Sequence, residues 1–279
     1  MYAILQNEGL TRLIMRSMYA NYHTHSYHCN HASGTPEQYV EAALASGIRI
    51  LGFSDHVPCD FTTGHRSGFR MEYSRTETYV TEILELREKY KDQAEIYIGY
   101  EAEFYPDEFL NVLNNILQYP CDYLILGQHF TKNEYDGVYV NGNRANNDLV
   151  LREYVDQLIT AVETGVYSCI NHPDILHYDL DETVYKREMG RLCEAAKFHN
   201  IPLEINLHGI DTKRTYPDPR FWQIAGDVGA PVIIGRDAHH PEAFYNTDTL
   251  RQGMELVSQF HLKLQETMVL RPVGKGTKA

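Results

Sequence analysis

Six short apolar stretches of this chain each end in residues that can bind a metal ion, and a seventh, at 202–206, ends in Asn206. Such stretches are typical of β-strands, and helix-like segments separate them along the chain. In a barrel of parallel strands, all strands end on one face, where the connecting loops build the active site. The pattern therefore predicts one dense cluster of imidazole and carboxylate ligands. The six stretches cover residues 20–25, 51–56, 98–101, 124–129, 167–172 and 233–239.

The alternation of strand-like and helix-like segments predicts an α/β fold with seven strands and seven helices. The first helix has the clearest signals, because Thr35 can cap it, Pro36 suits its first turn and Gly47 can end it. The sixth strand is followed by a long segment, 207–219, which we expect to be a loop. Further helices are predicted over residues 74–90, 107–117, 147–163, 181–199, 218–227 and 241–259.

The length of 279 residues suits one large α/β domain. We expect residues 1–17 to be an N-terminal extension and residues 18–279 to be a single catalytic domain. The extension lacks the continuous apolar run of a secretory signal, and no run approaches the ~20 residues that span a bilayer. The five cysteines form no CxxC pair and are odd in number, which indicates reduced thiols and a cytoplasmic protein.

The charge of the chain limits its partners. Lys and Arg number 25 against 38 Asp and Glu, so the net charge is −13. Such a chain is not expected to bind the nucleic-acid backbone or an anionic membrane surface. Bound dications would offset part of this charge, and a small-molecule phosphate ester is the expected partner. The sequence carries no signal for an oligomeric state.

The spacing of the candidate ligands supports a metal site. His23 and His25 are two residues apart, so both side chains leave the same face of an extended strand, and Asp237 and His239 repeat this spacing. Imidazole and carboxylate without a nearby thiolate suit Zn, Mn or Fe. The ligands are too many for one tetrahedral ion, and two or three ions with a bridging carboxylate are typical of sites that hydrolyse phosphate esters.

The ordered motifs resemble the polymerase and histidinol phosphatase (PHP) superfamily, and within it the histidinol-phosphate phosphatases. The resemblance covers nearly the whole chain from Met18 onward. It implies a distorted (β/α)7 barrel with the active site at the C-terminal ends of the strands, and a centre of three divalent ions (Zn, Fe or Mn). The motifs are His23-Thr24-His25-Ser26 with His31, Gly52-Phe53-Ser54-Asp55-His56, Gly99-Tyr100-Glu101, Gly127-Gln128-His129-Phe130, Asn171-His172-Pro173-Asp174, Leu203-Glu204-Ile205-Asn206 and Gly235-Arg236-Asp237-Ala238-His239.

The resemblance also implies which residues hold the three ions. Glu101 would bridge two of them, and Glu103, on the same face of the strand, is the alternative for this role. By position, the first ion takes His23, His25, Glu101 and Asp237, the second takes Glu101, His129 and His172, and the third takes His31, His56 and His239.

The implied activity is hydrolysis of L-histidinol phosphate to L-histidinol and inorganic phosphate, a step of histidine biosynthesis. A hydroxide bridging two ions would attack the phosphorus in line with the ester oxygen. The residues that would hold this hydroxide are His23, His25, Glu101, His129, His172 and Asp237.

Substrate contacts are predicted in the loops. Arg214, in the segment after the sixth strand, is the first candidate for the phosphate, because a guanidinium binds phosphate oxygens in pairs, and Arg144 is the second. His177 and His208 lie where the substrate could touch them. His208 follows Asn206 where related phosphatases carry small hydroxyl residues, so the details of the pocket are open at this point.

Two other functions are compatible with the sequence. One is another PHP phosphoesterase, such as a phosphotyrosine phosphatase or a nucleotide exonuclease, although a nucleic-acid groove should be basic. The other is a metal-binding domain without catalysis. Metal content and turnover of several phosphomonoesters would separate the three functions.

Overall fold

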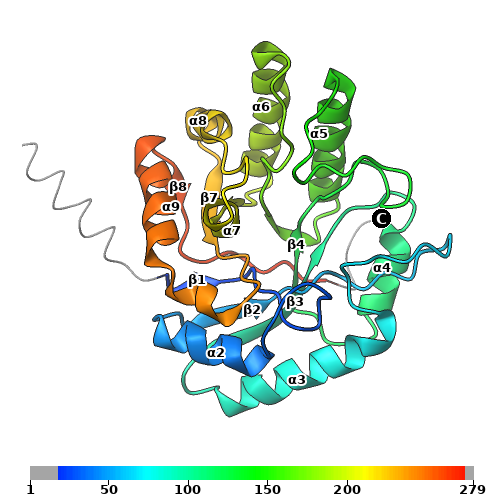
Figure 1. The fold of residues 1–279 in the computed structure, drawn as a ribbon, viewed down its shortest axis with the longest axis vertical. Coiled ribbons are helices and arrows are strands. Elements are labelled where there is room, and N and C mark those ends of the chain that lie inside the picture. Colours follow the sequence, from blue (N-terminus) through cyan, green and yellow to red (C-terminus); the bar gives the residue numbers. More distant parts are fainter. Residues whose placement is uncertain (1–17, 274–279) are drawn as a thin grey trace, which may run out of the picture.

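The structure of the chain is a computed structural model that describes residues 18–273. Eight parallel strands form one curved sheet, with the strands in chain order, and the helices lie around its outside (Figure 1). The strands are β1 (Ala20–Asn21), β2 (Ile50–Phe53), β3 (Glu95–Ala102), β4 (Tyr123–Leu126), β5 (Tyr167–Ile170), β6 (Leu203–Asn206), β7 (Pro231–Gly235) and β8 (Lys263–Leu264).

The helices follow the predicted order with two differences. The first helix has the predicted cap, in which Thr35 and Gln38 bond each other's backbone. The expected loop after β6 begins with a short helix, and the last predicted helix is split at Asn246, whose side chain caps the second part. The helices are α2 (Pro36–Ala45), α3 (Thr76–Lys89), α4 (Phe109–Ile116), α5 (Asp148–Glu163), α6 (Glu182–Phe198), α7 (Leu207–Asp211), α8 (Pro219–Val228) and α9 (Thr247–Gln259), with 3-10 turns η1 (Tyr73–Arg75) and η2 (Pro241–Tyr245).

The predicted α/β barrel architecture is confirmed, but the sheet formed by residues 18–273 has eight strands, because β8 pairs with the start of β7. At the opposite, C-terminal end the first and seventh strands meet directly. Thr24 and Ala238 form a parallel bridge, in which the His25 amide donates to the Ala238 carbonyl at 2.9 Å. Within residues 18–273, the ring of seven strands therefore closes at the end that carries the predicted ligands, whereas β8 pairs with β7 at the other end.

A tyrosine fills the middle of the barrel. The Tyr123 hydroxyl donates to the Tyr22 carbonyl at 2.6 Å and lies 3.1 Å from the Phe53 carbonyl, so it connects β4 to the ends of β1 and β2. Glycines at two neighbouring positions make room for this ring. A Cβ on Gly52 would lie 2.2 Å from the hydroxyl oxygen, and a Cβ on Gly99 would lie 2.4 Å from the ring. The bonds of Tyr123 therefore fix the ends of β1 and β2, and the residues that follow these ends build the site.

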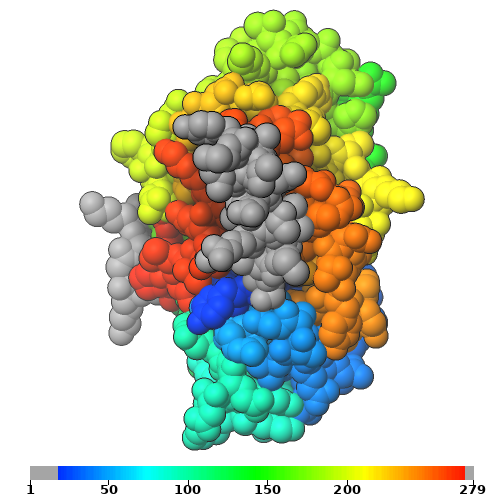
Figure 2. Space-filling view, turned by 90° about the vertical axis from the view of Figure 1, so that its left-hand side faces the viewer, coloured from blue at the N-terminus to red at the C-terminus, as the bar shows by residue number. Residues whose placement is uncertain are grey.

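The predicted division of the chain stays a prediction, because residues 1–17 and 274–279 lie outside the described part. Within residues 18–273 no helix is long and apolar enough to cross a membrane. The start of the described chain, dark blue in Figure 2, lies between the light-blue residues that follow it in sequence and the red C-terminal segment.

We predict that Tyr123→Phe lowers the free energy of unfolding by about 1–2 kcal/mol, because it removes a buried hydroxyl that two strand carbonyls share. Tyr97→Phe is the matched control, since the Tyr97 hydroxyl bonds the exposed Glu95 side chain. Urea unfolding of the two variants measures the difference. Equal stabilities would show that the Tyr123 hydroxyl does not hold the barrel together.

Candidate metal centre

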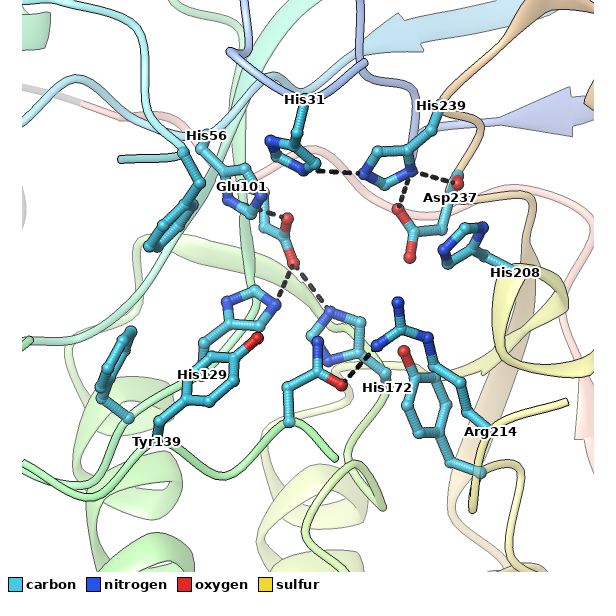
Figure 3. Close-up of a pocket in the computed structure, with 14 residues that line it drawn as sticks. His31, His56, Glu101, His129, Tyr139, His172, His208, Arg214, Asp237 and His239 are labelled. Atoms are coloured by element: carbon cyan, nitrogen blue, oxygen red, sulfur yellow. Dashed lines mark hydrogen bonds and ion pairs between the residues drawn. The ribbon is translucent and has the colours of Figure 1, made fainter. Parts of the chain in front are cut away.

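A cavity of about 590 Å³ opens at the C-terminal ends of the strands, and Figure 3 shows the side chains around it. Seven of the nine predicted metal ligands line this cavity. The other two, His23 and His25, lie beneath it, fully buried against Glu101 and Asp237. The seven are His31, His56, Glu101, His129, His172, Asp237 and His239.

Glu101 lies at the centre of the cluster, and its two oxygens face different imidazoles. Oε2 is 3.2–3.5 Å from ring nitrogens of one group, and Oε1 is 2.8–3.9 Å from ring nitrogens of the other. This arrangement suits a carboxylate that contributes one oxygen to each of two ions. The first group is His23, His25 and His56, and the second is His129 and His172.

A second carboxylate faces the first two histidines. Asp237 Oδ1 lies 3.2 Å from Nε2 of both His23 and His25, and these two nitrogens are 3.1 Å apart. On the outer side, Nε2 of His31 and Nε2 of His239 are 3.0 Å apart. Ligand atoms that converge on one point in this way can share an ion, and several groups of three in the cluster have this geometry.

Buried polar atoms also fit bound cations. His56 Nδ1 and Asp237 Oδ1 are buried and form no hydrogen bond within the described chain. Buried polar groups almost always have a partner, and a divalent cation would supply it here. The donor set of imidazole and carboxylate oxygen suits Zn, Fe or Mn.

Charge interactions dominate the protonation of the cluster. Burial alone would raise the pKa of Glu101, but the charges of His56 and His23 hold it well below its usual value. Burial would lower the pKa of His25, yet the nearby carboxylates of Asp237 and Glu101 raise it to about 9. Burial lowers the pKa of His56 well below its usual value. The protein without metal therefore keeps Glu101 ionised and holds a proton on His25 at neutral pH.

A layer of carboxylates and amides holds the imidazoles in place. Glu204 bonds His23 Nδ1 at 2.8 Å, and Asn206 donates to both Glu204 (2.9 Å) and Asp237 (3.1 Å). Because the Nδ1 atom is occupied, His23 presents Nε2 to the centre of the cluster. Partners of this kind fix the tautomer and orientation of metal-binding histidines.

Glu103 takes this supporting role on the opposite side. Its Oε1 bonds His129 Nδ1 at 2.9 Å and its Oε2 lies 2.7 Å from Arg70 Nη1, so the carboxylate is turned away from Glu101. This geometry favours Glu101 over Glu103 as the bridge. Burial opposes ionisation of Glu103, but the charge of Arg70 and the bond from His129 lower its pKa.

Glycines next to the carboxylates explain part of the sequence motifs. A Cβ on Gly127 would lie 1.8 Å from Glu101 Oε1, and a Cβ on Gly235 would lie 1.8 Å from Glu204 Oε1. Gly127 directly follows β4 and Gly235 is the last residue of β7, and both lie at the edge of the sheet that carries the ligands. Any larger residue there would displace a carboxylate that the histidines require.

Two predicted ligands have strained backbones. His172 and Asp237 have φ angles of 30° and 48°, in the left-handed region that side chains with a Cβ rarely adopt. Such strain is concentrated at functional sites, where the surrounding structure maintains it. Here it turns each side chain into the cavity just after its strand ends.

The structure separates the four predicted substrate contacts into two pairs. Arg214 and His208 line the cavity, and His208 stacks on His239 with ring centroids 4.8 Å apart. Arg144 and His177 do not line it. Arg144 Nε bonds Asp179 at 2.6 Å, and that pairing holds its side chain on the exposed rim. That these two residues contact the substrate stays a prediction.

Arg214 keeps an unneutralised charge at the cavity. Its Nη1 donates to Asn141 Oδ1 at 2.7 Å and its Nε donates to Thr212, both neutral partners. Within residues 18–273 no carboxylate forms an ion pair with it. The contact with Asn141 also joins the loop after β4 to the segment after β6 (Figure 3).

The sequence did not reveal several residues of the site. Glu204 had a visible signal, because it is the one charged residue in an apolar strand. The aromatic side chains carried no signal, since their loops fold back over the cavity only in three dimensions. The residues for which the sequence predicted no role are Glu204, Asn141, Tyr216, Phe69, Phe130 and Tyr139. Of these, Glu204 and Phe130 lie within the PHP-like motifs.

A family comparison matches this geometry. The model of the PHP domain matches residues 21–208, more than half of the chain. The chain belongs to the PHP domain family. A protein named probable histidinol-phosphatase from Deinococcus radiodurans is 26% identical over 258 residues, which cover 87% of this chain and 97% of that protein. The histidinol-phosphatase of Bacillus subtilis is 24% identical, with 78% of this chain and 92% of the relative covered.

A solved structure has the same fold. The histidinol phosphate phosphatase of Lactococcus lactis, crystallised with zinc, L-histidinol and phosphate, superposes with a TM-score of 0.66. The identity is 20%, and the match covers 88% of this chain and 95% of the other. At this identity the match shows that the PHP fold is shared.

We predict that metal binding releases protons from this PHP domain. His25, with a pKa of about 9, is protonated at pH 7.5 in the metal-free protein and must lose its proton to bind an ion. Apparent metal affinity should therefore rise with pH until about pH 9. Calorimetric titration in two buffers of different ionisation enthalpy should show roughly one to two protons released per chain. If metal binding releases no protons, the prediction that His25 binds an ion is wrong.

The Glu101→Gln variant should lose bound metal, and its kcat/KM for phosphomonoesters should fall by more than ~1000-fold. The reason is that the substitution removes one of the two carboxylate oxygens that face separate groups of ligands. Glu103→Gln, which changes only the support of His129, should cost about 10–100-fold. Elemental analysis and steady-state kinetics of both variants test this order. Equal losses of metal in the two variants would contradict the assignment of Glu101 as the bridge and Glu103 as a residue that only supports His129.

Proposed function

We propose that this chain is a metal-dependent phosphomonoesterase that hydrolyses L-histidinol phosphate to L-histidinol and inorganic phosphate. The observation that carries the proposal is the cavity itself, in which a cluster of histidines and carboxylates faces Arg214, whose guanidinium has no ion-pair partner within residues 18–273. The histidinol-phosphatases to which the chain is similar over most of its length support this substrate.

Three divalent ions, of Zn, Fe or Mn, are the proposed complement. Glu101 would bridge the first two ions, because its oxygens face separate imidazole groups. The first would take His23, His25, Glu101 and Asp237, the second Glu101, His129 and His172, and the third His31, His56 and His239.

Bound ions would supply an ionised water at neutral pH and neutralise charge on the phosphate. The protein residues orient the metal ligands and keep bulk water out of the cluster. Glu204 and Glu103 orient His23 and His129, so that these imidazoles need not reorganise during the reaction. Burial of Glu101 excludes bulk water from the centre of the cluster.

Arg214 is placed to bind the phosphate. It lines the cavity on the side opposite His129 (Figure 3). Asn141 accepts a hydrogen bond from one end of its guanidinium. The remaining N–H groups can donate to nonbridging oxygens, where charge develops in the transition state. His208 borders the same space and is the second proposed contact to the substrate.

Arg214→Ala should leave the metal content unchanged and lower kcat/KM about 10–1000-fold, because a charge-assisted contact to phosphate is lost. The loss should be similar for L-histidinol phosphate and p-nitrophenyl phosphate, since both carry the phosphate. Arg144→Ala is the matched control, since Asp179 holds that arginine outside the cavity, and it should change kcat/KM less than about 3-fold.

The reverse order of the two arginine variants would show that Arg144 moves to the phosphate when substrate binds. Turnover of L-histidinol phosphate by the unmodified protein tests the proposed activity itself. A protein that binds metal but hydrolyses none of a panel of phosphomonoesters would favour the non-catalytic function, and a preference for phosphotyrosine would favour the other PHP phosphoesterases.

A further inference from the structure

The cavity has two unlike walls, and only one of them is explained by phosphate chemistry. In Figure 3, Arg214 and His208 lie on the right, whereas Tyr139 lies on the left beside His129. We call the first group the polar wall, formed by Asn141, His208 and Arg214, and the second the aromatic wall, formed by Phe69, Phe130 and Tyr139.

The rings of the aromatic wall form a continuous surface. Phe69 and Phe130 are nearly parallel, with an interplanar angle of 15° and centroids 6.4 Å apart. Tyr139 continues the wall at 5.0 Å from Phe130, and their backbones form an antiparallel bridge. Both phenylalanines are only half-buried and Tyr139 is exposed, so these rings present area to the cavity.

The wall begins next to the proposed metal ligands. The Phe69 ring contacts His56 edge-to-face at 4.8 Å between centroids and lies 6.1 Å from His129. A phosphate held between Glu101 and Arg214 therefore has the aromatic wall beside it. The alcohol part of the ester can extend along these rings.

Polar contacts fix the loops that carry the wall. Glu134 bonds Arg70 Nε at 2.9 Å and His65 Nε2 at 3.2 Å, which ties the loop after β2 to the loop after β4. The Arg70 guanidinium lies 4.6 Å from the Phe69 centroid, but Glu103 and Glu134 neutralise its charge. The wall is therefore preorganised, and the charge of Arg70 beside it is compensated.

The charges around the cavity determine how a cationic group could bind. The carboxylates that line it, Glu101 and Asp237, are enclosed by histidines at the cluster, and none belongs to the aromatic wall. A positively charged ring would meet aromatic faces there, which attract cations and stack against flat groups. A flexible aliphatic alcohol would gain much less from the same surface.

We infer that the aromatic wall is the leaving-group pocket and that it selects esters whose alcohol carries a flat, protonatable ring, as the imidazole of histidinol is. The inference rests on the proposed phosphomonoesterase function and identifies Phe69 and Phe130 as residues that determine specificity.

Phe69→Leu and Phe130→Leu keep apolar volume but remove the aromatic face. Each should lower kcat/KM for L-histidinol phosphate about 10-fold, while kcat/KM for glycerol 3-phosphate should change less than about 3-fold. The control is Phe198→Leu, because Phe198 is 84% exposed at the end of α6, away from the cavity, and it should change neither value. Equal losses on both substrates, or no loss on either, would overturn the inference.

A measurement on the unmodified protein does not depend on the folding of a variant. With phenylalanine rings labelled by carbon-13, bound L-histidinol should show nuclear Overhauser effects between its imidazole protons and Phe ring protons. Saturating L-histidinol without such effects would overturn the pocket assignment. If the unmodified protein hydrolyses glycerol 3-phosphate but not L-histidinol phosphate, the proposed function fails first, and that outcome is distinct from equal losses in the variants.

Discussion

The Glu101 carboxylate is 1% exposed and has five imidazoles within 4 Å, and the rest of the site depends on this arrangement. A buried carboxylate is costly unless positive charge compensates it. Protons on the histidines provide that charge without metal, and divalent ions can provide it when bound. The missing side chain at Gly127 leaves the space for this carboxylate. Electrostatic compensation at Glu101 therefore links the fold to its proposed chemistry.

The barrel supports this centre through contacts between distant strands. The bridge of Thr24 with Ala238 closes the ring at the end where the ligands lie, while β8 pairs with β7 at the other end. Asp55 accepts bonds from the amides of Ser26 and Cys29, which fixes the turn that follows His25. The ligands thus depend on rigid strand ends, and the two walls of the cavity depend on loops that polar contacts tie together.

The sequence predicted the α/β architecture and the convergence of the polar residues at the strand ends, because both follow from periodicity and from the ends of parallel strands. His31 lies outside these strand ends, and only the resemblance to the PHP superfamily implied it as a ligand. It could not predict the pairing of Arg144 with Asp179 or of Arg214 with Asn141, since these contacts depend on how long loops fold over the rim. For the same reason the aromatic wall was not foreseen. The short helix α7 was missed because Asn206 caps it at the point where the strand ends.

Anomalous X-ray diffraction at the Zn, Fe and Mn edges, from crystals grown with inorganic phosphate, tests the central claim most directly. The account predicts three anomalous peaks within the cluster, two of them in contact with opposite oxygens of Glu101, and phosphate oxygens between these ions and Arg214. A single peak, or peaks that do not contact both oxygens of Glu101, would contradict the claim that this buried carboxylate organises a multinuclear centre for phosphate ester hydrolysis.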